Sequence, residues 1–194
     1  MPRSVQEAKR IDKQNSDMLL LDSIFKEMAN VRVAFEEFEG DKIQLPPGYQ
    51  EVGCHMIFDI KMGENFRRNA RMVAGGHTTE IPAAITYTSV VSRDSDMIAF
   101  TIAALNDLKV LACNIQNAYL IAKCKEKIWT IAGPEFVSDA GKLMIIVRAL
   151  YGLKSSDAAF RAFLAETLYD IGYTPSKADI YVWLRPEVKP DGFE

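Results

Sequence analysis

Apolar and polar residues follow one another along this chain in patterns typical of both helices and strands. Residues 5–30 carry apolar side chains at i, i+3, i+4 and i+7, which predicts a helix with a break near Asn15. Residues 31–40 alternate as a half-buried strand does, and Pro46, Pro47 and Gly48 then favour a loop. The first fifty residues therefore predict helix, strand and loop in that order.

Two alternating stretches, 51–62 and 65–76, flank a short turn at Gly63 and Glu64 and predict a β-hairpin. Ser92 is a predicted N-cap for a helix that follows it. The remaining predicted elements are a buried strand at 110–115, a helical stretch at 117–122, strands at 126–133 and 143–151, a helix from Ser155 or Ser156 to about Ile171, and a final strand at 178–186. Because these elements do not alternate regularly as βαβ units, the predicted fold class is α+β.

Composition and charge narrow the functional classes. The chain has 194 residues, 48% of them hydrophobic and 25% charged, as in a soluble globular domain or a large part of one. Its net charge of −3 argues against a free-standing nucleic-acid binder, which usually has a basic excess. The sequence has no signal-peptide core and no apolar run long enough to span a membrane. We therefore expect an intracellular protein, cytoplasmic or nuclear, with no membrane partner.

The three cysteines and two histidines are spaced in a way that predicts reduced cysteines and no metal site. Cys54, Cys113 and Cys124 all lie in or beside apolar runs, which favours reduced, buried thiols. Cys54 and His55 should point to opposite faces of one strand, and His77 adds no pair at zinc-ligand spacing. We therefore predict no zinc site.

Two local features of the sequence are candidates for a functional site. Basic residues outnumber acidic ones by four to two over 55–77, through Lys61, Arg67, Arg68 and Arg71. This basic hairpin is either a solvated face or a site for an anionic ligand. The second feature is Asn114, a polar side chain inside the otherwise apolar run that ends at Ile115.

Four stretches of the chain resemble the reverse transcriptase of Ty1/copia-type LTR retrotransposons. They are "IFDIKMGENFRRNARMVAGGHTTE", "YTSVVSRDSDMIAFTIAALN", "CNIQNAYLIAKCKEKIWTIAGPEF" and "IIVRALYGLKSSDAAF", in the family's order and spacing, followed by "SKADIYVW". The motif "ALYGLKSS" is the most specific of them. The resemblance implies the fingers and partial palm of a right-hand polymerase over 18–184, with a polar N-terminal extension over 1–17 and a frayed end over 185–194.

The resemblance also implies roles for single residues. Asn114 stands where the family has its first metal-binding Asp. Lys61 and Arg71 match fingers residues that contact the triphosphate, and Tyr119 matches the aromatic residue beneath the incoming sugar, an ordinary helix-core tyrosine being the alternative. The loop near template and nucleotide is matched by Tyr151, Gly152 and Lys154. The implied partners are an RNA template, a DNA primer and a deoxynucleoside triphosphate, and the implied cofactor is Mg²⁺.

Several departures from the family pattern bear on activity. Asn114 lacks the negative charge of the metal-binding Asp, the sequence has no Asp-Asp pair, and it stops before the family's YVDD-like hairpin. Asn69 and Gly75 stand where the family often has Lys, and Asp157 replaces a Pro or small residue and adds negative charge beside a phosphate backbone. We therefore expect a truncated, inactive polymerase domain that lacks the rest of the palm, RNase H and integrase. Two alternatives stay open: a retained nucleic-acid or protein-binding domain, and an active polymerase completed by downstream sequence.

Overall fold

The computed structural model describes residues 1–63, 66–80 and 90–186, which fall into two compact units. The first unit comprises Met1–Tyr87 and Asn117–Phe160, and the second comprises Thr88–Gln116 and Arg161–Glu194. Helices and strands are mixed without regular βαβ alternation, as the sequence predicts.

The first unit opens with two helices, α1 (Val5–Asn15) and α2 (Leu19–Val31). The predicted break near Asn15 is confirmed, because Ser16 after α1 adopts a left-handed conformation at φ 56°. Met18 before α2 makes no side-chain cap. The cap comes instead from buried Asp12, whose carboxylate accepts hydrogen bonds from the backbone N–H groups of Leu20 and Leu21.

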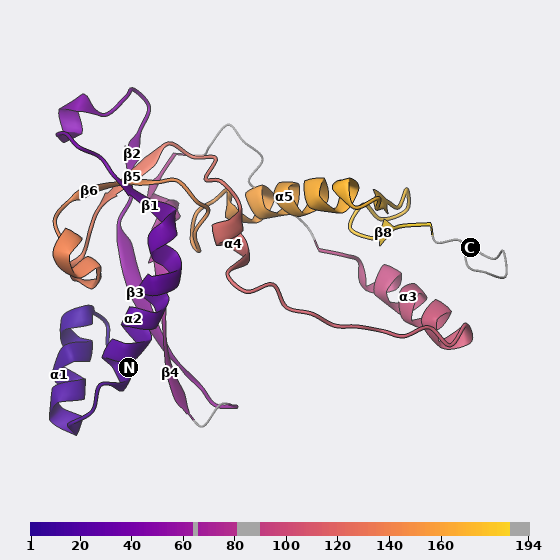
Figure 1. The fold of residues 1–194 in the computed structure, drawn as a ribbon, viewed down its shortest axis with the longest axis horizontal. Coiled ribbons are helices and arrows are strands. Elements are labelled where there is room, and N and C mark those ends of the chain that lie inside the picture. The colour runs from indigo at the N-terminus through magenta and orange to yellow at the C-terminus, as the bar shows by residue number, and fades with distance from the viewer. Residues whose placement is uncertain (64–65, 81–89, 187–194) are drawn as a thin grey trace. The chain divides into compact units, whose positions relative to one another are not determined.

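The predicted hairpin is confirmed as β3 (Cys54–Lys61) and β4 (Arg67–Ala74), paired antiparallel, while its turn residues 64–65 lie outside the described residues. In Figure 1 the hairpin runs beside α2. One face of it is buried, through Met56, Phe58, Ala70, Met72 and Ala74. The α2 side chain of Glu27 accepts a 2.9 Å hydrogen bond from the backbone N–H of Met72, which links the helix to β4.

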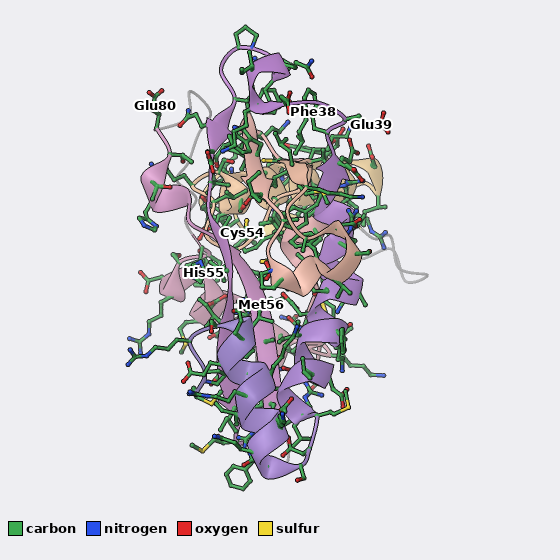
Figure 2. All side chains as sticks on the ribbon, turned by 90° about the vertical axis from the view of Figure 1, so that its left-hand side faces the viewer. Phe38, Glu39, Cys54, His55, Met56 and Glu80 are labelled. Atoms are coloured by element: carbon green, nitrogen blue, oxygen red, sulfur yellow. The ribbon has the colours of Figure 1, made fainter. Side chains whose placement is uncertain are left out.

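Figure 2 labels Cys54, His55 and Met56, the first three residues of β3. Cys54 is half-buried, His55 is exposed and Met56 is buried. Cys54 and His55 therefore lie on opposite faces of the strand, as predicted.

A second sheet of the first unit has the strand order β1-β6-β5-β2. Its strands are β1 (Phe35–Glu37), β6 (Leu143–Ile146), β5 (Ile128–Ile131) and β2 (Gln50–Glu51). The first three fall within predicted strands but are shorter, and β1 is shortened because the 3-10 helix η1 (Arg32–Ala34) precedes it. β2 pairs with β5 in parallel and was not predicted. Three further 3-10 helices are η2 (Lys42–Gln44), η3 (Gly76–Thr78) and η4 (Pro134–Asp139).

A single buried cluster joins both sheets of the first unit to α1 and α2. Its largest fully buried apolar side chains come from both ends of the unit's sequence and include Ile24, Met72, Ile128, Met144 and Leu150. The core therefore fixes residues 1–80 against residues 117–153.

The second unit contains α3 (Arg93–Leu105) and the short pair β7 (Thr174–Pro175) and β8 (Trp183–Leu184). Ser92 caps α3 as predicted, since its hydroxyl accepts a hydrogen bond from the Ser95 N–H. Helix α5 (Ser156–Asp170) begins in the first unit and continues into the second. Its end is marked by Gly172 at φ 88°, in agreement with the predicted stop.

The predicted buried strand at 110–115 is wrong. These residues form no strand in the described part of the chain, and Val110 and Leu111 are 62% and 90% exposed. Cys113 is likewise exposed, so only Cys54 and Cys124 match the expectation of shielded thiols. An apolar run becomes a strand only when a neighbouring backbone pairs with its N–H and C=O groups, and the three sheets of the described residues do not include this run. The helical stretch after it is a single turn, α4 (Ala118–Ile121).

No helix among residues 1–63, 66–80 and 90–186 is long and apolar enough to cross a membrane.

Candidate functional site

The hairpin divides its basic residues between two faces. Lys61 lies opposite Arg67 and Ile57 lies opposite Arg71, so Lys61, Arg67 and Arg71 share one face. Arg68 lies opposite Ile60 and therefore faces the other way, toward the buried side. The predicted basic hairpin thus has three basic side chains on its outer face, all of them exposed.

Arg71 stacks on the loop that follows β6. Its guanidinium carbon lies 4.4 Å from the centroid of the Tyr151 ring, a cation–π contact. The Tyr119 ring packs edge-on against Tyr151 at 4.7 Å between centroids, and against Phe160 of α5 at 6.4 Å. Arg71, Tyr119 and Tyr151, predicted from three separate sequence stretches, therefore meet in one cluster.

Asp157 completes this cluster from the first turn of α5. The Tyr119 hydroxyl donates a hydrogen bond to the Asp157 carboxylate. Burial raises the pKa of Tyr119 to about 12, and the bond to Asp157 and its negative charge add to that effect, while the charge of Arg71 opposes it. The hydroxyl therefore stays protonated at neutral pH and remains a donor to Asp157.

The loop from Tyr151 to Lys154 is held by backbone contacts to the end of β4. The Ala74 N–H donates a 2.8 Å hydrogen bond to the Tyr151 carbonyl. Gly152 adopts φ +89°, and a Cβ there would come within 2.8 Å of a Val73 methyl group. Lys154 donates a hydrogen bond from Nζ to the Thr79 carbonyl. The lysine is therefore engaged with the chain itself, and Gly152 is needed for the close approach.

Two buried serines hold the start of α5 and with it Asp157. The Ser156 hydroxyl donates a 2.6 Å hydrogen bond to the Leu150 carbonyl and accepts one from the Leu150 N–H. The Ser155 N–H and hydroxyl both donate to one carboxylate oxygen of Glu126, at 2.9 and 2.7 Å. Sequence reasoning did not identify Glu126, because no local pattern links it to a helix that begins thirty residues later.

Asn114 is exposed and belongs to the second unit, in a segment without regular secondary structure. Its amide supplies a neutral carbonyl oxygen, whereas protein Mg²⁺ sites usually use carboxylates. Among residues 1–63, 66–80 and 90–186, no three His, Cys, Asp or Glu side chains are grouped so that they could hold a metal ion. The described residues therefore do not fit a two-metal site of the kind that polymerases use.

The structure places the predicted site residues in three locations, one of which is the exposed segment of the second unit that carries Asn114. Arg71, Tyr119 and Tyr151 form one cluster, with Gly152 and Lys154 in the adjoining loop. Lys61 lies on the same face of the hairpin but at its turn end, opposite Arg67. Lys61 is itself engaged in an interaction with another group. The structure adds two residues to the cluster, Asp157 and Phe160, which both contact Tyr119. The sequence identified Asp157 only as a departure from the family pattern and did not identify Phe160 as a site residue.

Comparison with known proteins agrees with the resemblance of the motifs. The family profile "Reverse transcriptase (RNA-dependent DNA polymerase)" matches residues 40–189. The chain is 28% identical to the retrovirus-related Pol polyprotein from transposon RE2 of Arabidopsis thaliana over 141 residues, 69% of this chain and 10% of the relative. It is 29% identical to the corresponding polyprotein from transposon RE1 of the same plant over 147 residues, 72% of this chain and 10% of the relative.

No solved structure matches the chain significantly. The chain spans about a tenth of the length of each of these two relatives. The profile covers well over half of the chain, and all five residues of the cluster around Tyr119 lie within the range that it matches. This protein belongs to the reverse transcriptase (RNA-dependent DNA polymerase) family, in the branch found in copia-type retrotransposons.

Proposed function

We propose that this chain is the fingers and first part of the palm of a copia-type reverse transcriptase, and that it does not itself join nucleotides. The observation that carries this proposal is Asn114, an uncharged amide at the position to which the resemblance assigns the family's first metal-binding Asp. The absence of an acidic group of three among the described residues supports it.

The physical reason is the missing charge. Two-metal polymerases hold their ions with carboxylates and use the ions to stabilise the attacking and leaving oxygens. Two unit charges about 4 Å apart interact by roughly 4 kcal/mol at an effective dielectric of 20. Loss of that interaction in the transition state corresponds to roughly a thousandfold in rate. An amide at this position is therefore sufficient to suppress catalysis.

Primer extension tests the proposal directly. The 194-residue chain and its Asn114→Asp variant are incubated with an RNA template, a DNA primer, deoxynucleoside triphosphates and Mg²⁺. We expect no extension above background from the unaltered chain. Gain of extension in Asn114→Asp would assign the defect to the amide alone, and no gain would place a further defect elsewhere. Robust extension by the unaltered chain would overturn the proposal.

A second candidate function is binding of nucleic acid without catalysis. The observation that favours it is the outer face of the hairpin, where Lys61, Arg67 and Arg71 lie together. Basic side chains aligned on one face suit the regularly spaced phosphates of a nucleic-acid backbone. The acidic balance of the whole chain works against it.

The salt dependence of binding tests whether the basic side chains of the hairpin contact nucleic-acid phosphates. Affinity for an RNA–DNA hybrid is measured between 50 and 200 mM salt, in the unaltered chain and in Arg67→Gln. If Arg67 binds a phosphate, its replacement by the uncharged glutamine should reduce the slope of log K against log salt by about one. An unchanged slope would argue that Arg67 does not bind a phosphate.

The partners and location follow from the same proposal. An RNA template, a DNA primer and a deoxynucleoside triphosphate are the ligands of the family, and other polyprotein segments are its covalent neighbours. We place the chain inside the cell, in the cytoplasm or the nucleus. Mg²⁺ is the family's cofactor, but no step is assigned to it here because the described residues do not fit its site.

A further inference from the structure

The cluster around Tyr119 combines one cationic group with one anionic group. The Arg71 guanidinium lies over Tyr151, and the Asp157 carboxylate accepts the hydrogen bond of the Tyr119 hydroxyl. The two tyrosine rings pack against each other at 4.7 Å between centroids. Arg71 thus contacts one tyrosine of the aromatic pair and Asp157 contacts the other, within the first unit.

Both charges act on the same hydroxyl group. The Asp157 carboxylate raises the pKa of Tyr119, and the Arg71 guanidinium lowers it. An anionic ligand that binds Arg71 and reaches Tyr119 also meets the carboxylate that accepts the hydrogen bond of Tyr119. Unlike charges attract and like charges repel over such short separations, so the carboxylate offsets the attraction of the guanidinium for an anion.

Asp157 cannot easily move away from this position. It lies in the first turn of α5, which buried Ser155 and Ser156 anchor through hydrogen bonds to Glu126 and Leu150. An acidic side chain in the first turn of a helix is also stabilised there, because the unpaired N–H groups carry partial positive charge. Its carboxylate is hydrogen-bonded to Tyr119. The family resemblance implies that Tyr119 is the residue that a bound sugar contacts.

We propose that Asp157 is a specificity-determining residue that excludes nucleoside triphosphates from the Arg71 and Tyr119 cluster. It does so in two ways: its charge repels the triphosphate beside Arg71, and its hydrogen bond holds Tyr119 against Tyr151. This inference rests on the proposed function and on the nucleotide-site roles that the family resemblance implies for Arg71 and Tyr119, and it adds a second obstacle that is independent of Asn114.

The test is binding of dTTP without metal to the full chain, measured calorimetrically in EDTA. Asp157→Asn removes the charge and keeps an oxygen that can accept from Tyr119, while Asp157→Ala removes both. The matched control is Asp170→Asn, which makes the same change in net charge at the exposed other end of α5. Circular dichroism establishes that each variant retains its helices.

We expect Asp157→Asn to bind dTTP at least about tenfold more tightly than the unaltered chain, and Asp170→Asn to bind it no more tightly. Adding Arg71→Gln to Asp157→Asn should remove the gain, since the guanidinium provides the attraction. Spectrophotometric titration, with Tyr119→Phe as the reference, should show that Asp157→Asn lowers the pKa of Tyr119 from about 12.

The inference would be overturned by equal dTTP affinity in Asp157→Asn and Asp170→Asn, by no detectable binding in any variant, or by a gain that persists without Arg71. A gain for a short single-stranded oligonucleotide but not for dTTP would also overturn it, because the excluded ligand would then be a nucleic-acid backbone. Since no metal and no primer are present, failure here is distinguishable from failure of the primer-extension test.

Discussion

Gly76 lies directly against the backbone of Gly152, so that a Cβ added to Gly76 would meet the Gly152 carbonyl oxygen and approach the Leu153 Cα to 2.9 Å. The contact joins the residues that follow β4 to the loop that follows β6. This loop carries Tyr151, whose ring lies under Arg71. A backbone contact between two glycines therefore sets the spacing of the candidate site.

Gly152→Ala should destabilise the first unit strongly. The residue has φ +89°, and its new Cβ would meet both the Ala74 carbonyl oxygen and the Val73 side chain. Backbone strain and overpacking together predict a loss of about 2–5 kcal/mol in the free energy of unfolding, measured by urea denaturation.

Gly141→Ala is the matched control for this substitution. Gly141 has φ +88°, but a Cβ there would meet no atom within 4 Å. Only the backbone strain remains, which predicts a loss of about 1–2 kcal/mol. Equal losses in the two variants would show that the close approach at Gly152 contributes nothing.

Asp12→Ala should destabilise the pair α1 and α2. The buried carboxylate accepts from the N–H groups of Leu20 at 3.2 Å and Leu21 at 2.8 Å, and α2 has no cap from Met18. Loss of a helix cap predicts about 0.5–2 kcal/mol, measured by thermal or urea unfolding. Asp17→Ala is the comparison, since Asp17 accepts one longer bond of 3.4 Å from Leu19, and a larger effect there would contradict this assignment.

Cys113 should react with thiol reagents before the other two cysteines. Burial raises the pKa of both Cys54 and Cys124 to about 11, so few thiolates form there at pH 8, and both side chains are partly shielded. Cys113 is exposed in the segment 110–115. Stopped-flow measurement with a chromogenic disulfide should show one fast phase that Cys113→Ser removes. A fast phase that survives in Cys113→Ser would show that Cys54 or Cys124 is reactive, and no fast phase in the unaltered chain would show that Cys113 is covered.

Asp179 should make the stability of the second unit depend on acid pH. Its carboxylate accepts from the Ser92 N–H at 2.9 Å, the Tyr181 N–H at 2.9 Å and the Ser95 hydroxyl at 2.7 Å. These bonds, led by the one from Ser92, lower the pKa of Asp179 from 3.8 to about 2. Because the folded pKa is depressed, the stabilisation is fully present above about pH 4 and is lost as the pH falls through about 2.

The variant Asp179→Asn should therefore unfold at a lower temperature than the unaltered chain at pH 7, and the difference should shrink toward pH 2. Thermal unfolding followed by circular dichroism measures both. Asp170→Asn again provides a control, because its side chain is exposed at the end of α5. A difference that is independent of pH would rule out the carboxylate as the stabilising group.

Local signals in the sequence predicted several elements well. Alternation over 51–76 predicted the hairpin, Ser92 predicted the start of α3, and the region of Asn15 predicted the break between α1 and α2. These features depend on residues that are neighbours in the chain, through side-chain alternation, a capping hydroxyl and a polar interruption of a helical pattern. The motifs also sufficed to identify the family.

Where prediction failed, the deciding partner was distant in sequence. The run 110–115 has the composition of a buried strand but is exposed, because pairing requires another backbone alongside it. Strand β2 has only two residues and forms because β5, almost eighty positions later, lies parallel to it. Neither the exposure of residues 110–115 nor the pairing of β2 with β5 can be predicted from composition alone.

The sequence by itself determined the family, the hairpin and the Ser92 cap of α3. Only the tertiary structure decided that Arg71 stacks on Tyr151, that Tyr119 bonds to Asp157 and that Arg68 faces away from the other basic residues. The physical reason is the distance along the chain over which each kind of interaction acts. Periodicity and capping act within about one turn or one strand, whereas the charges and rings of the candidate site meet only after the core has joined residues 1–80 to 117–160.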